Sequence, residues 1–516
     1  MKPIRIHLWL LCWLAPAVWG QATDGQAAEG GAPDSDSANA RPNILFCIAD
    51  DWGYHFPGVG GKMPKTPTFE RIAAQGMRFT NAHAPAPSCT PTRNAILTGA
   101  HPWKLGRGAN LFSRFPEGFV TYPNLLAESG YHVGYNGKCF GPGKVPAGMP
   151  DPGVKSYGFP QNPGAFQAFL EDRKPGQPFC YWFGAQDPHR DYDRRLTREL
   201  GIGPEDVEVP PTFPDVEEVR WDIADYYAEV QRFDTLTGRH LEILAEQGLL
   251  DNTLIVVTSD HGWPFPRGKC NLYDAGTHVP LAVMWPGRVQ AGQTVEDFVN
   301  LADLAPTFLE VAGLPRPGQM TTRSLLGVLE SVPRAGLRDP ARDHVFTFKE
   351  RHCPSQWDTI GGYPMRAIHT KDYLYILNLE PDWWPVGCRL PSIRGQHYAD
   401  IDPGPTKEIF VRNTPDMTHL DPPFSLTVAK RPADELYHTP DDPHQLHNLA
   451  GDPQYAGILQ QLKSRLIDRL TADQDPRLLG KPEIYEFEPF LLQHDAKRFG
   501  ELKRQRMEEP GRGNKP

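Results

Sequence analysis

Several segments of the chain are continuous apolar runs that end in polar residues. Four of them are NILFCIADDWG, GYHVGYNGK, PFCYWFGAQDPHR and NTLIVVTSDHG. Because apolar and polar residues do not alternate within these runs, each predicts a strand that is buried on both faces. Amphipathic segments, TPTFERIAAQG and about residues 217–247, end at Gly76 and Gly248 and predict helices between the strands. This alternation predicts an α/β fold, with a mostly parallel sheet covered by helices on both faces.

The polar ends of these strands are the first candidates for a functional site. In open α/β sheets, ligands bind beyond the carboxyl ends of the strands. We therefore expect segments that are far apart in the sequence to meet at one edge of the sheet. The clusters are Asp50-Asp51, Lys138, Asp187 with His189, and Asp260-His261.

The pattern changes after about residue 315, where Pro, Arg and Gly become frequent up to residue 340. Residues 363–380 predict a hairpin with its turn at Thr370-Lys371-Asp372, and a helix is expected over about residues 455–470. We therefore expect a catalytic domain over residues 41–335 and a smaller α+β subdomain over residues 341–480. Residues 481–516 form a C-terminal extension.

The N-terminus has the pattern of a signal peptide. A basic start is followed by an apolar run from Leu8 to Trp19 and by small residues near Gly20. The run is too short to favour a membrane span, so no stable membrane insertion is expected. Residues 1–20 are therefore predicted to be a signal peptide and residues 21–40 a disordered linker. This predicts a secreted or periplasmic protein, and the absence of an N-x-S/T sequon favours bacterial export.

Composition narrows the possible partners. The chain has 516 residues with 53 basic and 63 acidic side chains, a net charge of −10, which argues against binding nucleic acid through bulk charge. Its eight cysteines, seven after signal removal, form no C-x-x-C pair. Neither a zinc site nor a dense disulfide framework is therefore indicated, and the odd count leaves at least one thiol over.

Three carboxylates at strand ends suit a metal ion. The adjacent Asp50 and Asp51 repel each other unless a cation lies between them or one is protonated. Together with Asp260 they offer the oxygen ligands that Ca²⁺ or Mg²⁺ prefers. The alternative, in which Asp50 and Asp51 cap the turn that follows them, stays open at this point.

Cys89 is the second chemical candidate. It lies in the Pro-rich segment SCTPTR, and Arg93 begins a helical run. Near a helix N-terminus and a cation, a negative or strongly polar group is favoured. A buried cysteine that serves only in packing is the alternative.

The segment Cys89-Thr90-Pro91-Thr92-Arg93 resembles the C-x-P-x-R motif of the type I sulfatases. The segments NILFCIADDWG, TGAHPWKLG, GYNGK, DPHR and TSDHG resemble further motifs of that family, in the same order and over nearly the whole mature chain. The resemblance implies an alkaline-phosphatase-like fold. It also implies that a maturation enzyme converts Cys89 to formylglycine, whose hydrated aldehyde is the nucleophile and is stabilised by Arg93.

The resemblance also implies a set of site residues. One Ca²⁺ per chain, with Mg²⁺ less favoured, would be bound by the modified Cys89 and four further ligands. Preorganised cations stabilise the spread negative charge of a sulfuryl group in transfer, and one group must protonate the leaving atom. His189 and Lys269 are both suited to that proton transfer. The implied metal ligands are Asp50, Asp51, Asp260 and His261, and the implied sulfate contacts are Lys138, His189 and Lys269.

Some positions depart from the family pattern. His261 stands where Asn is commonest, and Phe140 stands where most sulfatases carry a histidine. Segments near residues 260–276, 363–379 and 435–453 resemble the N-sulfoglucosamine sulfohydrolase (sulfamidase) branch, in which an arginine replaces Lys269. The resemblance therefore implies a sulfated carbohydrate substrate, with N-sulfoglucosamine-like sugars favoured. Residues 350–352, Glu-Arg-His, are expected at a sugar-facing rim.

Two alternatives stay open from the sequence. The first is a phosphonate or phosphate monoester hydrolase of the same fold, because the C-x-P-x-R motif occurs there too. The second is a sulfatase-like carbohydrate-binding protein with weak catalysis, which Phe140 would suggest. The metal-ligand positions and Cys89 with Arg93 favour the enzyme.

Overall fold

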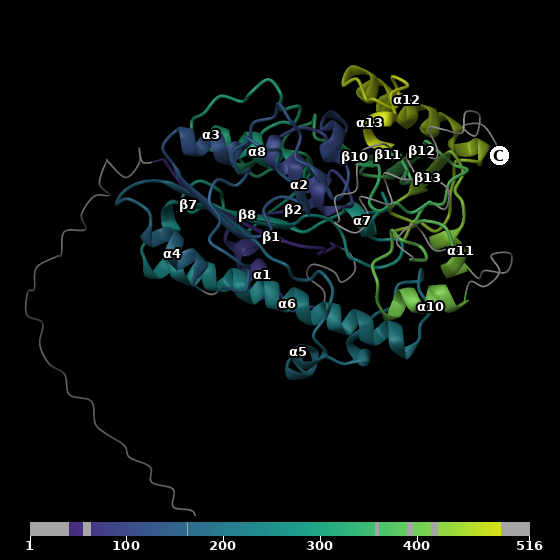
Figure 1. Ribbon diagram of the computed structural model, residues 1–516, viewed down its shortest axis with the longest axis horizontal. Coiled ribbons are helices and arrows are strands. Elements are labelled where there is room, and N and C mark those ends of the chain that lie inside the picture. The colour runs from purple at the N-terminus through teal and green to yellow at the C-terminus, as the bar shows by residue number, and fades with distance from the viewer. Residues whose placement is uncertain are drawn as a thin grey trace, which may run out of the picture. The chain divides into compact units, whose positions relative to one another are not determined.

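The larger of the two main sheets has seven strands in the order β4-β6-β1-β7-β8-β2-β9 (Figure 1). The first four strands are parallel neighbours, and β8 runs antiparallel to both β7 and β2. The predicted mostly parallel sheet is therefore confirmed. The strands are β1 (Asn43–Ala49), β2 (Met77–His83), β4 (His132–Gly137), β6 (Phe179–Gly184), β7 (Thr253–Ser259), β8 (Leu281–Met284) and β9 (Gln293–Asn300).

Helices cover both faces of this sheet, as the buried, non-alternating strands predict. Alternate side chains of β1 point to opposite faces: Leu45 joins one apolar core and Phe46 the other. The first core contains α1 (Pro67–Gln75), α4 (Ala165–Glu171) and α6 (Glu217–Glu246). The second contains α2 (Cys89–Thr98), α3 (Tyr122–Glu128) and α8 (Leu304–Val311), which lie on the other side of the sheet in Figure 1.

This computed structural model describes residues 41–54, 63–162, 164–356, 361–389, 396–413 and 422–486. The predicted signal peptide and linker, residues 1–40, lie outside the described residues, as does most of the predicted extension, residues 487–516. The described residues, which begin at Arg41, form one compact unit. The remaining short elements are β3 (Ser113–Arg114), β5 (Gly143–Lys144), α5 (Arg194–Glu199), α7 (Asp274–Thr277), α9 (Leu326–Leu329) and α13 (Glu483–Glu486).

A second, antiparallel sheet follows in the C-terminal part of the chain. Its order is β10-β11-β12-β13, and β11 and β12 form the predicted hairpin, with Met365 opposite Asn378. One face of this sheet packs on α12, and the other packs against Leu272 and Tyr273 of the larger domain. These elements are β10 (His344–Lys349), β11 (Met365–Thr370), β12 (Tyr373–Asn378), β13 (Asp434–His438), α10 (Pro405–Asn413), α11 (Pro422–Val428) and α12 (Ala456–Ala472).

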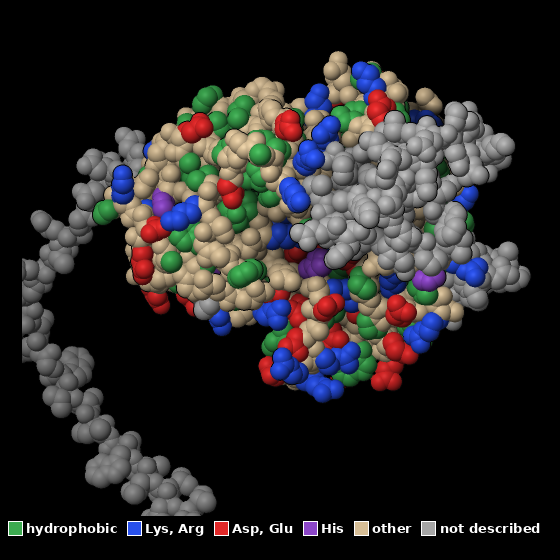
Figure 2. Space-filling model, in the orientation of Figure 1, with side chains coloured by type: hydrophobic (Ala, Val, Ile, Leu, Met, Phe, Trp, Pro, Cys, Tyr) green, Lys and Arg blue, Asp and Glu red, His purple; other side chains and the backbone are tan. Residues whose placement is uncertain are grey.

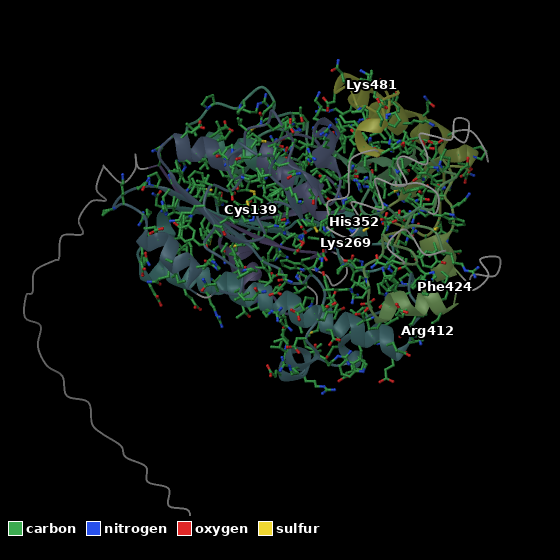
Figure 3. All side chains as sticks on the ribbon, viewed as in Figure 1. Cys139, Lys269, His352, Arg412, Phe424 and Lys481 are labelled. Atoms are coloured by element: carbon green, nitrogen blue, oxygen red, sulfur yellow. The ribbon has the colours of Figure 1, made fainter. Side chains whose placement is uncertain are left out.

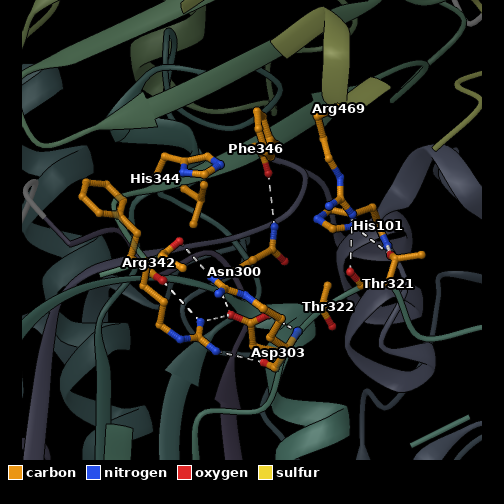
Figure 4. A pocket seen from close by; sticks show the side chains of 13 residues that line it. His101, Asn300, Asp303, Thr321, Thr322, Arg342, His344, Phe346 and Arg469 are labelled. Atoms are coloured by element: carbon orange, nitrogen blue, oxygen red, sulfur yellow. Dashed lines mark hydrogen bonds and ion pairs between the residues drawn. The ribbon is translucent and has the colours of Figure 1, made fainter. Parts of the chain in front are cut away.

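A polar seam joins the two sheets (Figure 4). The side-chain amide of Asn300, at the end of β9, donates to the backbone carbonyl of Phe346 in β10 over 3.2 Å. The buried Arg342 pairs with Asp303 over 2.7 Å, just before the second sheet begins. Arg469 of α12 donates to the backbone carbonyl of Thr321 over 3.4 Å. Directed hydrogen bonds across this seam therefore fix the second sheet against the first.

Replacing Arg366 by leucine is expected to destabilise the protein by about 3–5 kcal/mol, because the buried Asp475 then loses its ion pair and Glu350 keeps only its pair with Arg477. Arg366 lies in β11 and pairs with Asp475 over 2.7 Å and with Glu350 over 2.8 Å, all three side chains being buried. Urea unfolding of the two proteins measures the difference. Arg465→Leu is the matched control, since its pair with Asp343 is partly exposed and is worth about 1 kcal/mol or less. Equal losses for the two variants would contradict the prediction.

Two further observations concern the distribution of surface charge and the apolar character of the helices. On the face shown in Figure 2, acidic and basic side chains are interspersed over the described residues, with a mixed cluster at the lower edge around α5. Among the described helices, none combines the length and the apolar character needed to cross a bilayer.

Candidate active site

The four predicted polar strand ends meet at one edge of the larger sheet. Their strands, β4, β6, β1 and β7, are consecutive neighbours and parallel, so their carboxyl ends lie together. Backbone hydrogen bonds fasten these ends to one another. The Asp50 amide donates to the carbonyl of Asp187 over 3.0 Å, and the Asp260 amide donates to the carbonyl of Ala49 over 3.1 Å.

Cys89 lies at the N-terminus of α2 and is buried at 2 % exposure. Its Sγ is 3.5 Å from Asp50 Oδ1 and 3.3 Å from His261 Nε2. Burial raises the pKa of the Cys89 thiol, and the opposing effect of Lys138 is smaller. The helix end and the nearby cations therefore do not ionise the thiol, because desolvation outweighs them. An unmodified Cys89 is a neutral thiol.

The predicted metal ligands surround Cys89. One ligand atom each from Asp50, Cys89, Asp260 and His261 lies within 4.8 Å of the others, and all four residues are buried. Asp51 has a positive φ of 83°, a backbone conformation that non-glycine residues adopt mainly where the surroundings enforce it. Its amide donates to Asp260 Oδ1 over 3.1 Å, and its carbonyl accepts from the hydroxyl of Tyr226 over 2.8 Å. These bonds hold the strained turn that keeps two adjacent acids at one site.

The tautomer of His261 fits a metal ligand. Its Nδ1 lies 3.0 Å from the carbonyl of Gly262, which only accepts, so Nδ1 carries the proton. In the neutral ring Nε2 then presents a lone pair, and it faces Asp51 Oδ1 at 3.1 Å and Asp260 Oδ1 at 3.6 Å. Lone pairs this close repel unless a cation lies among them, and Asp51 Oδ1 accepts no hydrogen bond from the described residues. The donor set of carboxylate oxygens and one imidazole nitrogen therefore fits a divalent cation.

Three cations surround these acids. Lys138 Nζ is 2.5 Å from Asp50 Oδ2, and Arg93 Nε is 2.8 Å from Asp260 Oδ2. Burial of Asp50 opposes its ionisation, but Lys138 and Arg93 outweigh burial and hold the pKa of that carboxyl well below its usual range. The third cation, Lys269, is 3.1 Å from Asp51 Oδ2. Asp50 is thus held ionised, whereas burial raises the pKa of the Asp51 carboxyl against the opposing effect of Lys269.

His189 and a pocket complete the site. His189 Nδ1 donates to the carbonyl of Arg190 over 2.6 Å, so Nε2 carries the lone pair of the neutral ring. His189, Lys138 and Asp50 line a pocket of about 580 Å³, together with the aromatic side chains of Phe112, Tyr135 and Phe159. Phe159 is 82 % exposed at this pocket. The pocket therefore combines charged groups at its base with aromatic walls.

Sequence reasoning missed Asp402, which lies just before α10. Its carboxylate is 2.9 Å from Lys269 Nζ, and one of its oxygens lies within 4.8 Å of ligand atoms of His189 and Asp51. Lys269 therefore bridges a metal-site acid and an acid from the C-terminal part of the chain. No local motif marks Asp402, because its role depends on a loop that arrives from a distant part of the sequence.

His352 also reaches the site, although not in the predicted way. Its Nδ1 is 2.8 Å from the hydroxyl of Ser88, the residue before Cys89, and it interacts electrostatically with Lys269, beside which Figure 3 shows it. Burial, reinforced by Lys269, lowers the pKa of His352 well below its usual value. Glu350 instead pairs with two buried arginines and is itself 3 % exposed, so it forms no exposed rim.

Phe140 takes a packing role where a histidine was expected from the resemblance. Its ring contacts the ring of Phe115 edge-on, with centroids 5.7 Å apart, and it lies against the second apolar core. The polar cluster residue Asp187 likewise faces away from the site, since its carboxylate pairs with Arg232 over 2.5 Å. Cys47, Cys139, Cys180 and Cys270 are buried thiols that form no disulfide among the described residues.

Comparison with known protein families gives two matches. The family described as "Sulfatase" matches residues 42–143 and 164–314. The family described as "N-sulphoglucosamine sulphohydrolase, C-terminal" matches residues 259–381. The two matches together cover the larger sheet, the polar strand ends and the first three strands of the second sheet.

Individual relatives resemble the chain over most of its length. Human N-sulphoglucosamine sulphohydrolase is 28 % identical over 503 residues, covering 87 % of this chain and 93 % of its own. An ulvan-active sulfatase of Formosa agariphila is 25 % identical, covering 86 % of this chain and 77 % of its own. A solved structure of a protein in complex with its substrate D-glucosamine-2-N,6-O-disulfate has a TM-score of 0.60 and 22 % identity, covering 84 % of this chain and 98 % of that chain. That last likeness shows the fold.

Proposed function

Because the chain belongs to the sulfatase family and is a sulfatase, we propose that it hydrolyses sulfate esters or sulfamates of carbohydrates, with N-sulfoglucosamine-like substrates favoured. The observation that carries the proposal is the arrangement around Cys89, whose Sγ lies 3.5 Å from Asp50 and 3.3 Å from His261, with Asp50 also lining the pocket. The preference for N-sulfated sugars is supported by the C-terminal family match at residues 259–381 and by the human relative.

The pocket supports a carbohydrate substrate. Its volume of about 580 Å³ is in the range of small-ligand sites. Lys138 and His189 at its base suit a sulfate group, and the aromatic side chains of Phe112, Tyr135 and Phe159 offer flat apolar faces to a sugar ring. A charged base with aromatic walls fits a sulfated sugar better than a wholly apolar ligand.

We propose that Asp50, Asp51, Asp260 and His261 hold one Ca²⁺ together with residue 89, and that a maturation enzyme converts Cys89 to formylglycine. When bound, the ion withdraws charge from a sulfate oxygen and favours ionisation of the hydroxyl at residue 89. The buried, neutral thiol of Cys89 is a poor nucleophile as it stands, which supports the need for conversion.

The remaining residues are assigned by their geometry. Lys138 and Lys269 place positive charge on both sides of the ligand group, where they stabilise the charge that develops on the sulfuryl oxygens. Arg93 pairs with Asp260 over 2.8 Å and so fixes one ligand carboxylate while facing residue 89. One hydroxyl of the hydrated formylglycine loses its proton and bonds to sulfur as the bond from sulfur to the sugar oxygen or nitrogen breaks, and the leaving atom takes a proton. The second hydroxyl then expels sulfate as the aldehyde re-forms, and water hydrates the aldehyde again.

His189 is the better candidate for supplying that proton. Burial of Lys269 opposes its protonation, but Asp402 and Asp51 outweigh burial and raise the pKa of Lys269 well above its ordinary value. So tightly held a proton is donated poorly near neutral pH. The imidazole of His189 is fixed by its Nδ1 bond to Arg190, so the acid is the protonated ring, whose Nε2–H gives its proton to the leaving atom in the pocket.

His189→Gln is therefore expected to lower kcat on a sugar sulfate by about 10²- to 10⁴-fold, because the departing sugar oxygen or nitrogen needs a proton. The loss on 4-nitrophenyl sulfate should be far smaller, since nitrophenolate leaves without protonation. Steady-state kinetics on both substrates measures the difference. His132→Gln, which changes a histidine bonded to the carbonyl of Phe169, is the matched control. Equal losses of the His189 variant on both substrates would contradict the role as acid.

Sulfate release tests the proposed function directly. Protein from a maturation-competent host is incubated with N-sulfated glucosamine, with 6-O-sulfated glucosamine and with a phosphonate monoester. Release of sulfate from the N-sulfated sugar at the highest kcat/KM supports the proposal. A preference for the O-sulfated sugar would overturn the N-sulfate assignment, and turnover of the phosphonate alone would overturn the sulfated substrate.

Export and domain limits complete the proposal. The signal-peptide pattern of residues 1–20 supports secretion or periplasmic export. We place the catalytic domain at residues 41–335 and the α+β subdomain at residues 341–480, because the first contains the larger sheet and the second contains β10 to β13 with α12.

A further inference from the structure

A second cluster of metal-ligating side chains lies between the two sheets and contains none of the catalytic residues. It consists of His83 at the end of β2, Asp274 at the start of α7 and His369 in β11. One ligand atom from each lies within 4.8 Å of the others. His83 and His369 are 3 % and 2 % exposed. Three residues from distant parts of the sequence thus bring two imidazoles and a carboxylate together in a largely buried place.

The tautomer of His83 is fixed by its surroundings. His83 Nδ1 is 3.3 Å from the hydroxyl oxygen of Thr277. That hydroxyl donates its proton to the carbonyl of Tyr273 over 3.2 Å, so it accepts from His83. Nδ1 of His83 therefore carries the ring proton, and Nε2 is the nitrogen that has a lone pair to offer a metal.

Asp274 and His369 have matching geometry. Asp274 Oδ1 is 3.3 Å from His369 Nδ1. Ligand atoms about 2.0–2.1 Å from a tetrahedral Zn²⁺ are roughly 3.3 Å apart, so this pair already has the required separation. Binding of the metal releases to solvent the proton that lies between His369 Nδ1 and Asp274, and Nε2 then carries the ring proton beside the hydroxyl of Thr347.

Each of the three ligands also has an outer partner that orients it. Thr277 holds His83, and the hydroxyl of Thr347 lies 3.0 Å from His369 Nε2. The side-chain amide of Gln445 donates to Asp274 Oδ2 over 3.3 Å. Such outer hydrogen bonds accompany histidine and carboxylate ligands in metal sites and fix their orientation.

We propose that His83, Asp274 and His369 bind a divalent transition-metal ion of the Zn²⁺ class, separate from the catalytic cation. Two imidazole nitrogens and one carboxylate oxygen suit Zn²⁺, whereas Ca²⁺ requires six or more oxygen ligands. The three side chains line a pocket of about 320 Å³, from which water supplies the fourth ligand. Lys371, which lines the same pocket, pairs with Glu296 over 3.1 Å and so does not neutralise Asp274.

The position of the ion gives it a structural role. It joins β2 of the larger sheet to β11 of the second sheet through the first residue of α7. The amide of Gly262, next to the catalytic ligand His261, donates to the carbonyl of Gly276 in α7 over 2.9 Å. By fixing α7, the ion therefore stabilises the position of the segment that carries His261 and Lys269.

Zinc binding to the full chain in excess Ca²⁺ tests the proposal, with isothermal titration and metal analysis as readouts. We expect one Zn²⁺ per chain in addition to Ca²⁺. His369→Gln should weaken Zn²⁺ binding by about 100-fold or more. Thr277→Val removes no ligand, only the hydroxyl that accepts from His83 and donates to Tyr273, and should weaken it by about 10- to 100-fold. Asp260→Asn should leave Zn²⁺ binding unchanged, because it alters the catalytic cluster.

His438→Gln is the matched control, because His438 pairs with Asp441 on the surface over 2.9 Å and should bind Zn²⁺ no differently from the parent. If His369→Gln fails to fold by circular dichroism, Thr277→Val decides. Parent-like Zn²⁺ binding by the Thr277 variant, or loss of Zn²⁺ binding in Asp260→Asn, overturns the second site. Neither result depends on sulfate release, so the outcome is independent of the proposed function.

Discussion

Cys89→Ala is expected to abolish sulfate release, with kcat falling on the order of 10⁶-fold, the scale found when a nucleophile is removed from an otherwise intact site. The variant keeps the pocket, Lys138 and His189, so substrate binding should change far less than turnover. The buried position at the start of α2 tolerates alanine, which is smaller and a good helix former. Rates from sulfate release, with binding followed separately, measure the two effects.

The same experiment reports on maturation when it is paired with a peptide mass. In parent protein from a maturation-competent host, the tryptic peptide containing Cys89 should carry an aldehyde in place of the thiol. Cys180→Ser, which alters a buried cysteine of β6, is the control and should retain sulfate release. An active parent whose Cys89 is an unmodified thiol would refute the formylglycine proposal.

Much of the site was predictable because its residues follow strands. A continuous apolar run with a polar end identifies both a buried strand and the edge at which a ligand binds. The sheet order places β4, β6, β1 and β7 side by side, so the polar residues after each strand converge without further information. The convergence of Lys138, Asp50 and Asp260 at one edge of the sheet was predictable for that reason.

The contacts that cross between the two sheets were not predictable in the same way. Asp402 binds Lys269, and His352 bonds to Ser88, only because the C-terminal part of the chain packs over the strand ends. No local sequence pattern indicates which C-terminal loop packs against the strand ends. The protonation of Cys89 was not predictable either, since the helix end and the cations are visible in the sequence whereas complete burial is a property of the packed core.

The second large effect is expected for Asp260→Asn, which should lower both metal affinity and turnover, turnover falling on the order of 10³-fold. One carboxylate oxygen of Asp260 accepts from the Asp51 amide over 3.1 Å, and the other accepts from Arg93 over 2.8 Å. An asparagine of the same size has one acceptor, so its NH₂ group must oppose one of these donors. The variant also removes a negative charge beside His261 and leaves the buried Arg93 with less compensation.

Metal analysis and sulfate release on the same sample separate these effects from general damage. Asp225→Asn is the matched control, because Asp225 is a buried carboxylate that binds Arg194 over 2.7 Å and Thr197 over 2.6 Å on the α5–α6 contact. It should cost stability while leaving bound Ca²⁺ and kcat near those of the parent. If Asp260→Asn retained both the metal and the rate, Asp260 would serve only to hold Arg93 and the Asp51 turn. The cation would then have to depend on the remaining ligands, and the assignment of the centre would have to change.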